Sequence, residues 1–432
     1  MFEVRQKPEM VERALLVRLY FDKSEAEESA SLLEELGELV STLGIEIADS
    51  VLAKSREMHK KYLCGTGKAA EIVELAKAHQ CDCIVIDNNL APSQQREWEK
   101  LADLCVIDRE EVILDIFGKR AQTKEARLQV ELAKMQYALP RLARMWGHLD
   151  REGGGGGSGG GGGAERGMGE KQIEIDRRLA HLSIDRCKRE LEIVRKQRKT
   201  QRKEREKLDT PHAAIVGYTN AGKSTMLNII SGSDVMAKDM LFATLDTTTR
   251  RIDLPDGQPL LITDTVGFVR NLPHRLVEAF KATLEEAVLA DFLIHVLDAT
   301  SPEIEIFQAT TLHVLEELGA IDKPIITVLN KIDKVTDPWE LICLEKRFPD
   351  AIHASAITGQ GLDDIYKACS QVLADRVTHE NYRIPQMRGD ILNLLHKDAK
   401  VLSTEYDEND IIVTAIVPAN IAGKLNEFLV VK

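Results

Sequence analysis

The sequence contains no apolar run that approaches the roughly 20 residues a membrane-spanning helix requires. Cysteine is also scarce, because only seven are spread along the chain without the spacing of a disulfide framework, as suits a reducing compartment. Residues 1–18 carry three glutamates among their apolar residues, so we do not expect a signal peptide. These absences predict a cytoplasmic protein without a membrane span, a location that allows a peripheral membrane-associated fraction.

The composition is that of a protein with real hydrophobic cores. The 432 residues are 44% hydrophobic and 29% charged, values that exclude wholesale disorder and a collagen-like fibre. At roughly 150 residues per domain, the length suggests about three domains. The formal net charge of −13 would alone argue against a nucleic-acid partner, but the charge is unevenly distributed.

Residues 1–121 alternate between predicted strands and helices. The predicted strands are 12–20, 45–53, 83–87 and 104–108, and the predicted helices are 24–43, one ending near 80, 92–102 and 110–117. Such alternation favours a mainly parallel sheet covered by helices. We therefore predict a small N-terminal α/β domain over residues 1–121.

Two short patterns in this domain could suggest further sites. The stretch His79-Gln80-Cys81-Asp82-Cys83 could be part of a metal site, but no second Cys/His cluster completes four ligands. Gly65-Thr66-Gly67-Lys68 could suggest a second nucleotide site, but it lacks the full phosphate-loop spacing. We favour cysteines around a buried strand for the first pattern and a loop entering a helix for the second.

Residues 122–208 predict a helical hairpin. Apolar residues at helical spacing indicate one long helix over 122–148, which Pro140 is expected to kink. Residues Gly153–Gly163 are ten glycines and one serine, which cannot form a packed core and predict a mobile loop or linker. A second long helix over about 169–207 would pack antiparallel to the first.

The second helix carries the unevenly distributed charge. The stretch from Arg177 to Lys207 contains thirteen Lys and Arg residues but only five Asp and Glu residues. One interpretation is a solvated coiled-coil face of alternating charge. The other is an arm that lies against a phosphate backbone. No aromatic residues interleave the basic run, so contact with backbone or shape is favoured over base stacking.

A phosphate loop follows the hairpin. Residues 212–216 predict a short apolar strand, and the next eight fit the G-x-x-x-x-G-K-[ST] pattern between a strand and a helix. The candidate nucleotide-binding residues of this stretch are Gly217, Tyr218, Thr219, Asn220, Ala221, Gly222, Lys223, Ser224 and Thr225. Backbone N–H groups and the Lys223 charge suit the β- and γ-phosphates, and the Ser224 hydroxyl suits Mg²⁺.

A D-x-x-G motif ends the predicted strand over 259–263. It consists of Asp264, Thr265, Val266 and Gly267. Asp264 is positioned to hold a metal-bound water, and the Gly267 N–H can meet a γ-phosphate and move away after its loss.

Two further motifs end predicted strands and suit guanine. Asn330-Lys331-Ile332-Asp333 follows the strand over 325–329, and Ser355-Ala356 follows the strand over 351–354. The Asp333 carboxylate can accept both guanine N1–H and N2–H₂, a donor pair that adenine lacks, and the backbone at Ser355-Ala356 can meet guanine O6. Together the four motifs predict a Mg²⁺-dependent enzyme that hydrolyses GTP to GDP and phosphate.

A threonine near residue 248, Phe268 and Asn220 bear on the rate of hydrolysis. On composition, Thr247, Thr248 and Thr249 compete as the threonine that closes over Mg²⁺ and the γ-phosphate, and an ordinary loop remains an alternative for each. Phe268 occupies the position of the water-orienting glutamine of many GTPases, so we expect slow intrinsic hydrolysis. Asn220 stands where K⁺-binding GTPases carry a ligand for that ion, and a loop-bracing role is the alternative.

These motifs define the last two predicted domains. We predict a Ras-like P-loop GTPase domain with a mostly parallel sheet over residues 209–377. Residues 378–432 predict a small α+β domain, with a strand at 382–384, a helix over 386–397, two strands joined at the acidic turn 407–410, and a helix over 418–429.

The chain resembles the HflX family of ribosome-associated GTPases over essentially its full length. The resemblance is carried by GYTNAGKST (217–225), LFATLD followed by TTRR (241–251), DTVGFVRNLPHRLVEAFKATLEE (264–286) and NKID (330–333), and outside them by AQTKEARLQVELAKMQYALPRL (121–142) and GEKQIEIDRR (169–178). Two departures are a longer, nearly pure glycine loop in the hairpin and Thr247 in place of the family's proline.

The resemblance implies a ribosomal partner. In that family the N-terminal domain and the hairpin bind rRNA of the large ribosomal subunit, the GTP-bound protein splits stalled or idle ribosomes, and ribosomes stimulate hydrolysis. It also selects Thr248 as the second Mg²⁺ ligand beside Ser224. For this chain it implies catalytic roles for Lys223, Asn220, Thr248 and Gly267, GTP and GDP as ligands, possible K⁺ use, and a monomer.

Two rival functions remain open. One is a ribosome-assembly or RNA-binding scaffold, in which GTP stabilises one conformation and turnover is incidental. The other is a K⁺-activated GTPase of RNA modification, in which dimerisation stimulates turnover.

Overall fold

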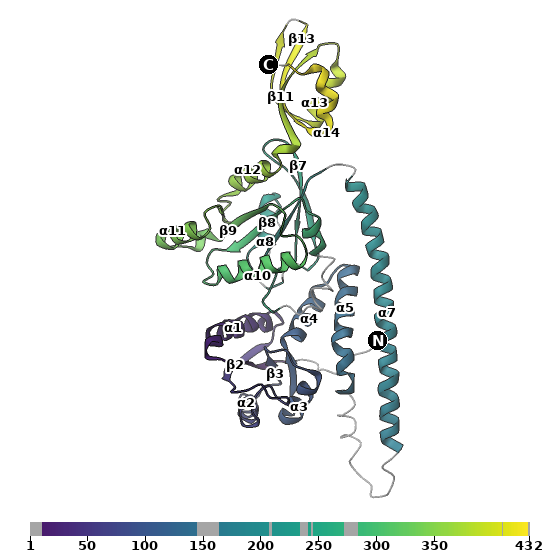
Figure 1. The fold of residues 1–432 in the computed structure, drawn as a ribbon, viewed down its shortest axis with the longest axis vertical. Coiled ribbons are helices and arrows are strands. Elements are labelled where there is room, and N and C mark those ends of the chain that lie inside the picture. The colour runs from purple at the N-terminus through teal and green to yellow at the C-terminus, as the bar shows by residue number, and fades with distance from the viewer. Residues whose placement is uncertain are drawn as a thin grey trace. The chain divides into compact units, whose positions relative to one another are not determined.

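A computed structural model describes residues 11–144, 164–206, 210–233, 241–242, 245–271, 284–407 and 409–430 (Figure 1). The chain divides into two compact units, which are described separately. The first contains residues 1–197 together with 240–242 and 270–280, and the second contains the remainder. The α/β fold class predicted from the sequence is confirmed in both.

The first unit is built on a four-stranded parallel sheet in the order β2-β1-β3-β4. Its strands are β1 (Arg13–Tyr20), β2 (Glu46–Lys54), β3 (Cys83–Ile86) and β4 (Cys105–Asp108). Its helices are α1 (Ala26–Thr42), α2 (Thr66–Ala78), α3 (Pro92–Ala102) and α4 (Arg109–Arg120), and a short 3-10 turn over Lys23–Glu25 precedes α1. The predicted alternation is thus confirmed, with ends that differ by a few residues.

The two weak patterns of this sheet have structural roles. Gly65 is the extended residue that precedes α2, as a loop entering a helix requires. Cys81 and Cys83 are buried beside or in β3, and all seven cysteines are free thiols. No group of three or more His, Cys, Asp or Glu side chains suited to a metal occurs among the described residues.

The first long helix of the hairpin ends earlier than the sequence predicts. The helix α5 spans Lys124–Ala138, and a 3-10 turn over Leu139–Arg144 replaces the expected kinked continuation to residue 148. Pro140 has no N–H to bond to the preceding turn, so the chain tightens there instead of bending. The rest of that prediction and Gly153–Gly163 lie outside the described residues.

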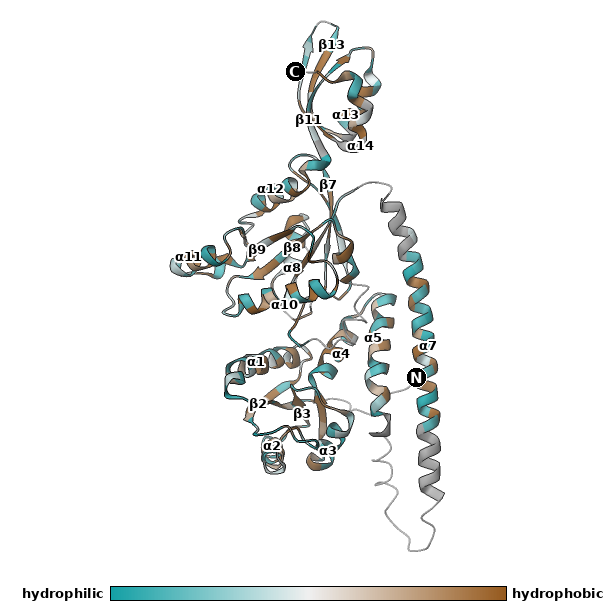
Figure 2. Cartoon of the chain, in the orientation of Figure 1, coloured by the Kyte–Doolittle hydropathy of each residue, from teal (hydrophilic) through white to brown (hydrophobic). Residues whose placement is uncertain are grey.

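The second hairpin helix, α7 (Ala164–Glu206), packs along α5 (Figure 1). Leu128 of α5 forms a small apolar cluster with Cys187 and Leu191 of α7. The coloured part of α7 is mostly hydrophilic with some hydrophobic stretches (Figure 2), and Glu190 and Glu192 pair with Arg186 and Lys196 one turn away. The described part of α7 therefore has one narrow buried seam and a charged, solvated face.

Two short stretches from far along the chain belong to the core of the first unit. The ring of Phe242 packs edge-on against Phe117 of α4, with centroids 4.6 Å apart. The guanidinium of Arg270 pairs with Glu35 of α1 at 2.9 Å, and Glu35 also pairs with buried Arg109. The segments that flank the stretch with the D-x-x-G motif are thus held by buried aromatic and ionic contacts.

The second unit contains a six-stranded sheet in the order β10-β9-β8-β5-β7-β6, parallel except for β6. Its strands are β5 (His212–Gly217), β6 (Thr248–Asp253), β7 (Pro259–Asp264), β8 (Phe292–Asp298), β9 (Ile325–Asn330) and β10 (Ile352–His353). Its helices are α8 (Lys223–Ile230), α10 (Ile304–Glu317), α11 (Pro338–Arg347) and α12 (Leu362–Val372). Apolar residues of α8 and α12 share one core with the central strands.

The last sheet has three antiparallel strands in the order β11-β13-β12. It comprises β11 (Val377–Pro385), α13 (Gly389–Asp398), β12 (Lys400–Asp407), β13 (Asp410–Pro418), α14 (Ala419–Leu425) and a 3-10 turn over Asn426–Phe428. The predicted α+β arrangement and the acidic turn are confirmed. The strand predicted at 382–384 is longer than expected, and α14 ends before residue 429. The bounds of the four predicted domains stay predictions.

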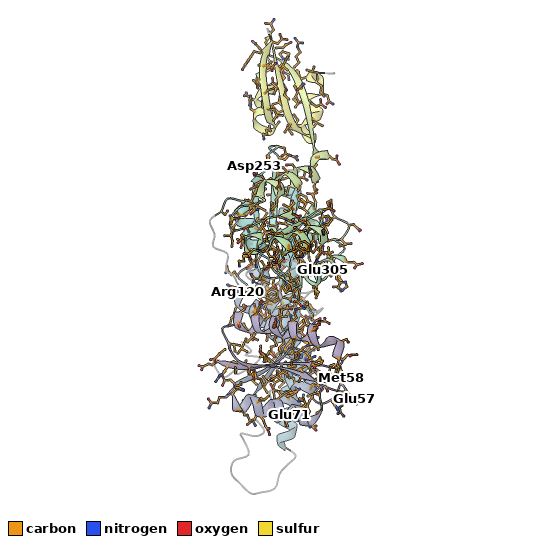
Figure 3. All side chains as sticks on the ribbon, turned by 90° about the vertical axis from the view of Figure 1, so that its left-hand side faces the viewer. Glu57, Met58, Glu71, Arg120, Asp253 and Glu305 are labelled. Carbon is orange, nitrogen blue, oxygen red and sulfur yellow. The ribbon has the colours of Figure 1, made fainter. Side chains whose placement is uncertain are left out.

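In both units the strands are largely hydrophobic, and much of the helix surface is hydrophilic (Figure 2). Figure 3 shows Glu57, Met58 and Glu71 at the surface of the first unit and Glu305 at the surface of the second. No helix in the described ranges combines the length and apolarity that crossing a bilayer requires.

His295 in the centre of β8 is fully buried, and neither ring nitrogen has a hydrogen-bond partner among the described residues. Burial, reinforced by the charge of Lys223, lowers its pKa from 6.5 to about 4. Below pH 6.5 the unfolded chain therefore binds a proton that the folded chain excludes, so the stability contributed by His295 falls as pH falls toward 4.

We predict that His295 costs the folded state about 2 kcal/mol of its free energy of unfolding between pH 7 and pH 5. The variant His295→Leu should lose that part of the pH dependence in urea unfolding. His313 in α10 is exposed, so His313→Leu is the control and should keep the wild-type slope. An unchanged slope in His295→Leu would refute the prediction.

Candidate nucleotide site

The phosphate loop connects β5 to α8 at the carboxyl edge of the parallel sheet. Gly222 precedes α8 with φ +91°, and a Cβ there would lie 2.3 Å from Nδ2 of Asn330. Only glycine fits such a conformation and approach. The loop backbone therefore turns tightly into the helix, where free N–H groups and the helix dipole suit an anion.

Lys223 is buried at the start of α8, and its ammonium donates to the carbonyl of Tyr218 at 2.6 Å. Burial lowers the pKa of Lys223 to about 8, and the nearby Asp264 carboxylate partly opposes that shift. The ring of Tyr218 stacks on Phe307 of α10, with centroids 3.9 Å apart. The loop thus holds one desolvated positive charge at the position where phosphates would meet it.

The candidate metal ligands lie beside this lysine. The Ser224 hydroxyl donates to Oδ2 of Asp264 at 2.6 Å, and Asp264 is buried at the end of β7. A hydroxyl beside a buried carboxylate, next to a loop suited to phosphate, fits a hard cation such as Mg²⁺. Thr225 follows in the first turn of α8.

The strand β6 begins at Thr248 and so distinguishes the three competing threonines. Thr248 pairs in register with Asp264. Thr249 shares a hydroxyl hydrogen bond with Thr263 at 2.8 Å, so it is engaged within the sheet. Thr247 precedes the strand. Thr248 is therefore the threonine nearest in register to the Asp264 carboxylate.

The D-x-x-G segment lies on the phosphate loop. A Cβ on Gly267 would lie 2.8 Å from Nζ of Lys223. The Phe268 carbonyl accepts from the Thr219 N–H at 2.8 Å, and the Phe268 N–H donates to the carbonyl of Gly217. The Phe268 ring is buried and carries no polar group that could orient a water.

Other members of the first two motifs support the loop. The Thr265 hydroxyl donates to the carbonyl of Ile215 at 2.7 Å, and Val266 is buried. Asn220 is different, because it is exposed and has a left-handed backbone with φ +60°. Asparagine adopts this conformation more readily than most residues.

Asn330 links the guanine-binding motifs to the phosphate loop through hydrogen bonds of its side chain. Its Nδ2 donates to the carbonyl of Ala221 at 2.8 Å, and its Oδ1 accepts from the N–H of Ala356 at 3.0 Å. The Ser355 hydroxyl donates to Asp333 at 2.5 Å. The structure therefore brings all four sequence motifs to one edge of the sheet.

Two residues of this edge were not found from the sequence. Asp298 ends β8 and pairs with Lys331 at 2.7 Å, and Phe307 supports Tyr218 from α10. The sequence did contain a signal for Asp298, because it is the one charged residue of the otherwise largely apolar stretch Phe292–Asp298. It ends that stretch, as the residues of the other motifs end or follow their strands. Phe307 had none, since its role depends on a stacking contact between distant segments.

Three family models match successive parts of the chain. They are described as GTP-binding GTPase N-terminal (residues 30–118), GTP-binding GTPase Middle Region (120–205) and 50S ribosome-binding GTPase (212–331).

Curated relatives match along almost the whole chain. A protein of Akkermansia muciniphila named GTPase HflX is 60% identical, with 99% of each chain covered. Proteins of the same name from Lacrimispora saccharolytica and Escherichia coli are 40% and 41% identical, covering 98% and 92% of this chain and 98% and 91% of theirs.

We predict that Gly222→Ala weakens GDP binding at least about 100-fold, because the added Cβ meets Asn330 and strains a left-handed backbone. Isothermal titration would measure the affinity. Gly232 also has a positive φ, +64°, but an added Cβ there meets nothing within 4 Å. Gly232→Ala is therefore the matched control and should bind GDP like the wild type. Equal affinities of both variants would show that crowding at Asn330 is unimportant.

Proposed function

Because the chain belongs to the HflX family of GTPases, we propose that its GTP-bound form binds the large ribosomal subunit and splits stalled or idle ribosomes. Hydrolysis of GTP then times release from the subunit. The observation that carries the proposal is the match of residues 212–331 to a family model described as 50S ribosome-binding GTPase, within a chain that matches curated relatives along its length.

The proposed phosphate chemistry follows from the loop. Lys223 and the N–H groups of residues 217–224 bind the β- and γ-phosphates and stabilise the charge that develops on transfer. Ser224 and Thr248 would ligate Mg²⁺, and Asp264 would support the site by holding a metal-bound water. The magnesium ion supplies positive charge to the two terminal phosphates. Gly267 senses the γ-phosphate, an assignment supported by its close approach to Lys223.

The proposed guanine specificity depends on the hydrogen bonds by which Asn330 joins the phosphate loop to the loop after β10. Asp333 accepts the two guanine donors, Asn330 holds its loop against the phosphate loop, and the Ser355-Ala356 backbone meets guanine O6. The contacts of Asn330 with Ala221 and Ala356 support this assignment. ATP is discriminated against, because adenine leaves the Asp333 carboxylate without the two donors that guanine offers it.

Hydrolysis requires a group that activates the attacking water or stabilises the transferred charge, and the Phe268 side chain can do neither. We assign part of that help to K⁺ held by Asn220, whose exposed position and left-handed backbone in the phosphate loop suit a ligand for a bound ion. The rest comes from the ribosome. The hairpin, with its excess of Lys and Arg between 177 and 207, and the N-terminal α/β domain provide the rRNA contacts.

Replacing K⁺ by Na⁺ tests the role of Asn220. We predict that GTP turnover of the wild type falls about tenfold or more in Na⁺, because a positive charge near the β–γ bridge is lost. Asn220→Ala should have the low rate in both buffers while keeping GDP affinity. A variant that loses GDP affinity equally in K⁺ and Na⁺ would identify Asn220 as a brace for the loop instead.

Light scattering of 70S ribosomes tests the splitting proposal. We predict a fall in scattering on addition of the chain with GTP or with a non-hydrolysable GTP analogue, but not with GDP. With the analogue, the chain should remain on the large subunit in sedimentation, because hydrolysis is required for release.

Other outcomes identify the rival functions. Binding to large subunits without any fall in scattering would favour an assembly or RNA-binding scaffold. A nucleotide- and K⁺-dependent dimer that ignores ribosomes would favour the dimerising GTPase.

A further inference from the structure

Asp298 lies outside every nucleotide motif, yet both of its carboxylate oxygens are engaged at the site. Oδ1 accepts from the backbone N–H of Thr300 at 3.0 Å and from its hydroxyl at 2.7 Å. Oδ2 pairs with Nζ of Lys331 at 2.7 Å. The loop that follows β8 therefore fixes the carboxylate in place, and the remaining oxygen is directed at the lysine of the N-K-x-D motif.

The ion pair is largely shielded from water. The side chains of Asp298 and Lys331 are only 19% and 17% exposed, so solvent screens their attraction less than it screens an exposed pair. Removing one charge of such a pair leaves the other without its partner in a partly desolvated position. The pair is thus suited to hold a precise geometry.

Lys331 needs such a hold, because its backbone is strained. Its φ is +67° and its ψ is +27°, a left-handed conformation that side chains other than glycine rarely adopt. Conformations of this kind persist only where the surroundings impose them. The preceding residue, Asn330, is fixed by its two side-chain hydrogen bonds. Asn330 also pairs in register with Asp298, where β9 lies beside β8.

The turn at Lys331 determines where Asp333 points. A 3-10 turn over Ile332–Lys334 follows directly, and the Asp333 carboxylate is held from the other side by Ser355. We propose that Asp298 is a positioning residue of the guanine site. Through Lys331 it keeps this loop in the left-handed turn that presents Asp333 to the base. This inference rests on the guanine site of the proposed function and adds a residue to it.

The variant Asp298→Asn tests the proposal, because the amide keeps an acceptor for Thr300 and loses the charge for Lys331. We predict that a fluorescent GDP analogue dissociates at least about tenfold faster, as expected for loss of a charged hydrogen bond. GTP turnover at saturating GTP should change less than the Michaelis constant. Asp364 forms an exposed ion pair with Lys367 in α12, so Asp364→Asn is the matched control and should release GDP at the wild-type rate.

A double-mutant cycle separates positioning from a general effect on stability. If Asp298 acts through Lys331, adding Asp298→Asn to Lys331→Met should change the dissociation rate by less than about twofold. Full additivity, or a wild-type rate in Asp298→Asn alone, would overturn the proposal. Should Asp298→Asn fail to fold, Thr300→Val removes one donor to the carboxylate and should accelerate dissociation in the same direction. An unchanged rate in Thr300→Val would then overturn the proposal.

A different measurement, the affinity of the wild type for ADP and for GDP, tests the proposed guanine site. A wild-type chain that binds ADP as tightly as GDP would refute the guanine site itself. A wild type that prefers GDP, together with an unaffected Asp298→Asn variant, would refute only the role of Asp298.

Discussion

The amide of Asn330 is the constraint on which the nucleotide site depends. It joins the carbonyl of Ala221 in the phosphate loop to the N–H of Ala356 after β10, so two loops from different strands are held by one buried side chain. The same amide lies where a Cβ on residue 222 would clash. The position of Asn330 in the guanine motif therefore requires glycine at residue 222 of the phosphate loop.

The phosphate loop is supported from several further directions. Phe268 hydrogen-bonds to it through its backbone, Phe307 stacks on Tyr218, and Lys223 is bonded to the Tyr218 carbonyl. A buried lysine with a lowered pKa gains most from anionic phosphates, because they supply the counter-charge that burial denies it. A loop held in this way needs little reorganisation when nucleotide binds.

Local patterns predicted the strands and the motifs of the site, because an apolar strand followed by a polar turn needs no distant partner to be recognised. The predicted end of the first hairpin helix was wrong, since a 3-10 turn that contains Pro140 follows α5 where the helix was expected to bend and continue. The strand β6 was not predicted, because Thr248 and Thr249 join a sheet only by pairing with β7. Asp298 and Phe307 act through segments far apart in the chain, so spacing alone could not identify their roles. Register in the sheet, not composition, separates Thr248 from Thr249.

GTP turnover with and without purified large ribosomal subunits is the measurement that shows whether the ribosome stimulates this GTPase. The site has Phe268 where many GTPases carry a glutamine that orients the attacking water, so we expect slow hydrolysis by the chain alone. We predict slow turnover by the chain alone and stimulation of at least about tenfold by the subunits. Rapid turnover by the chain alone, or none added by the subunits, would contradict the account.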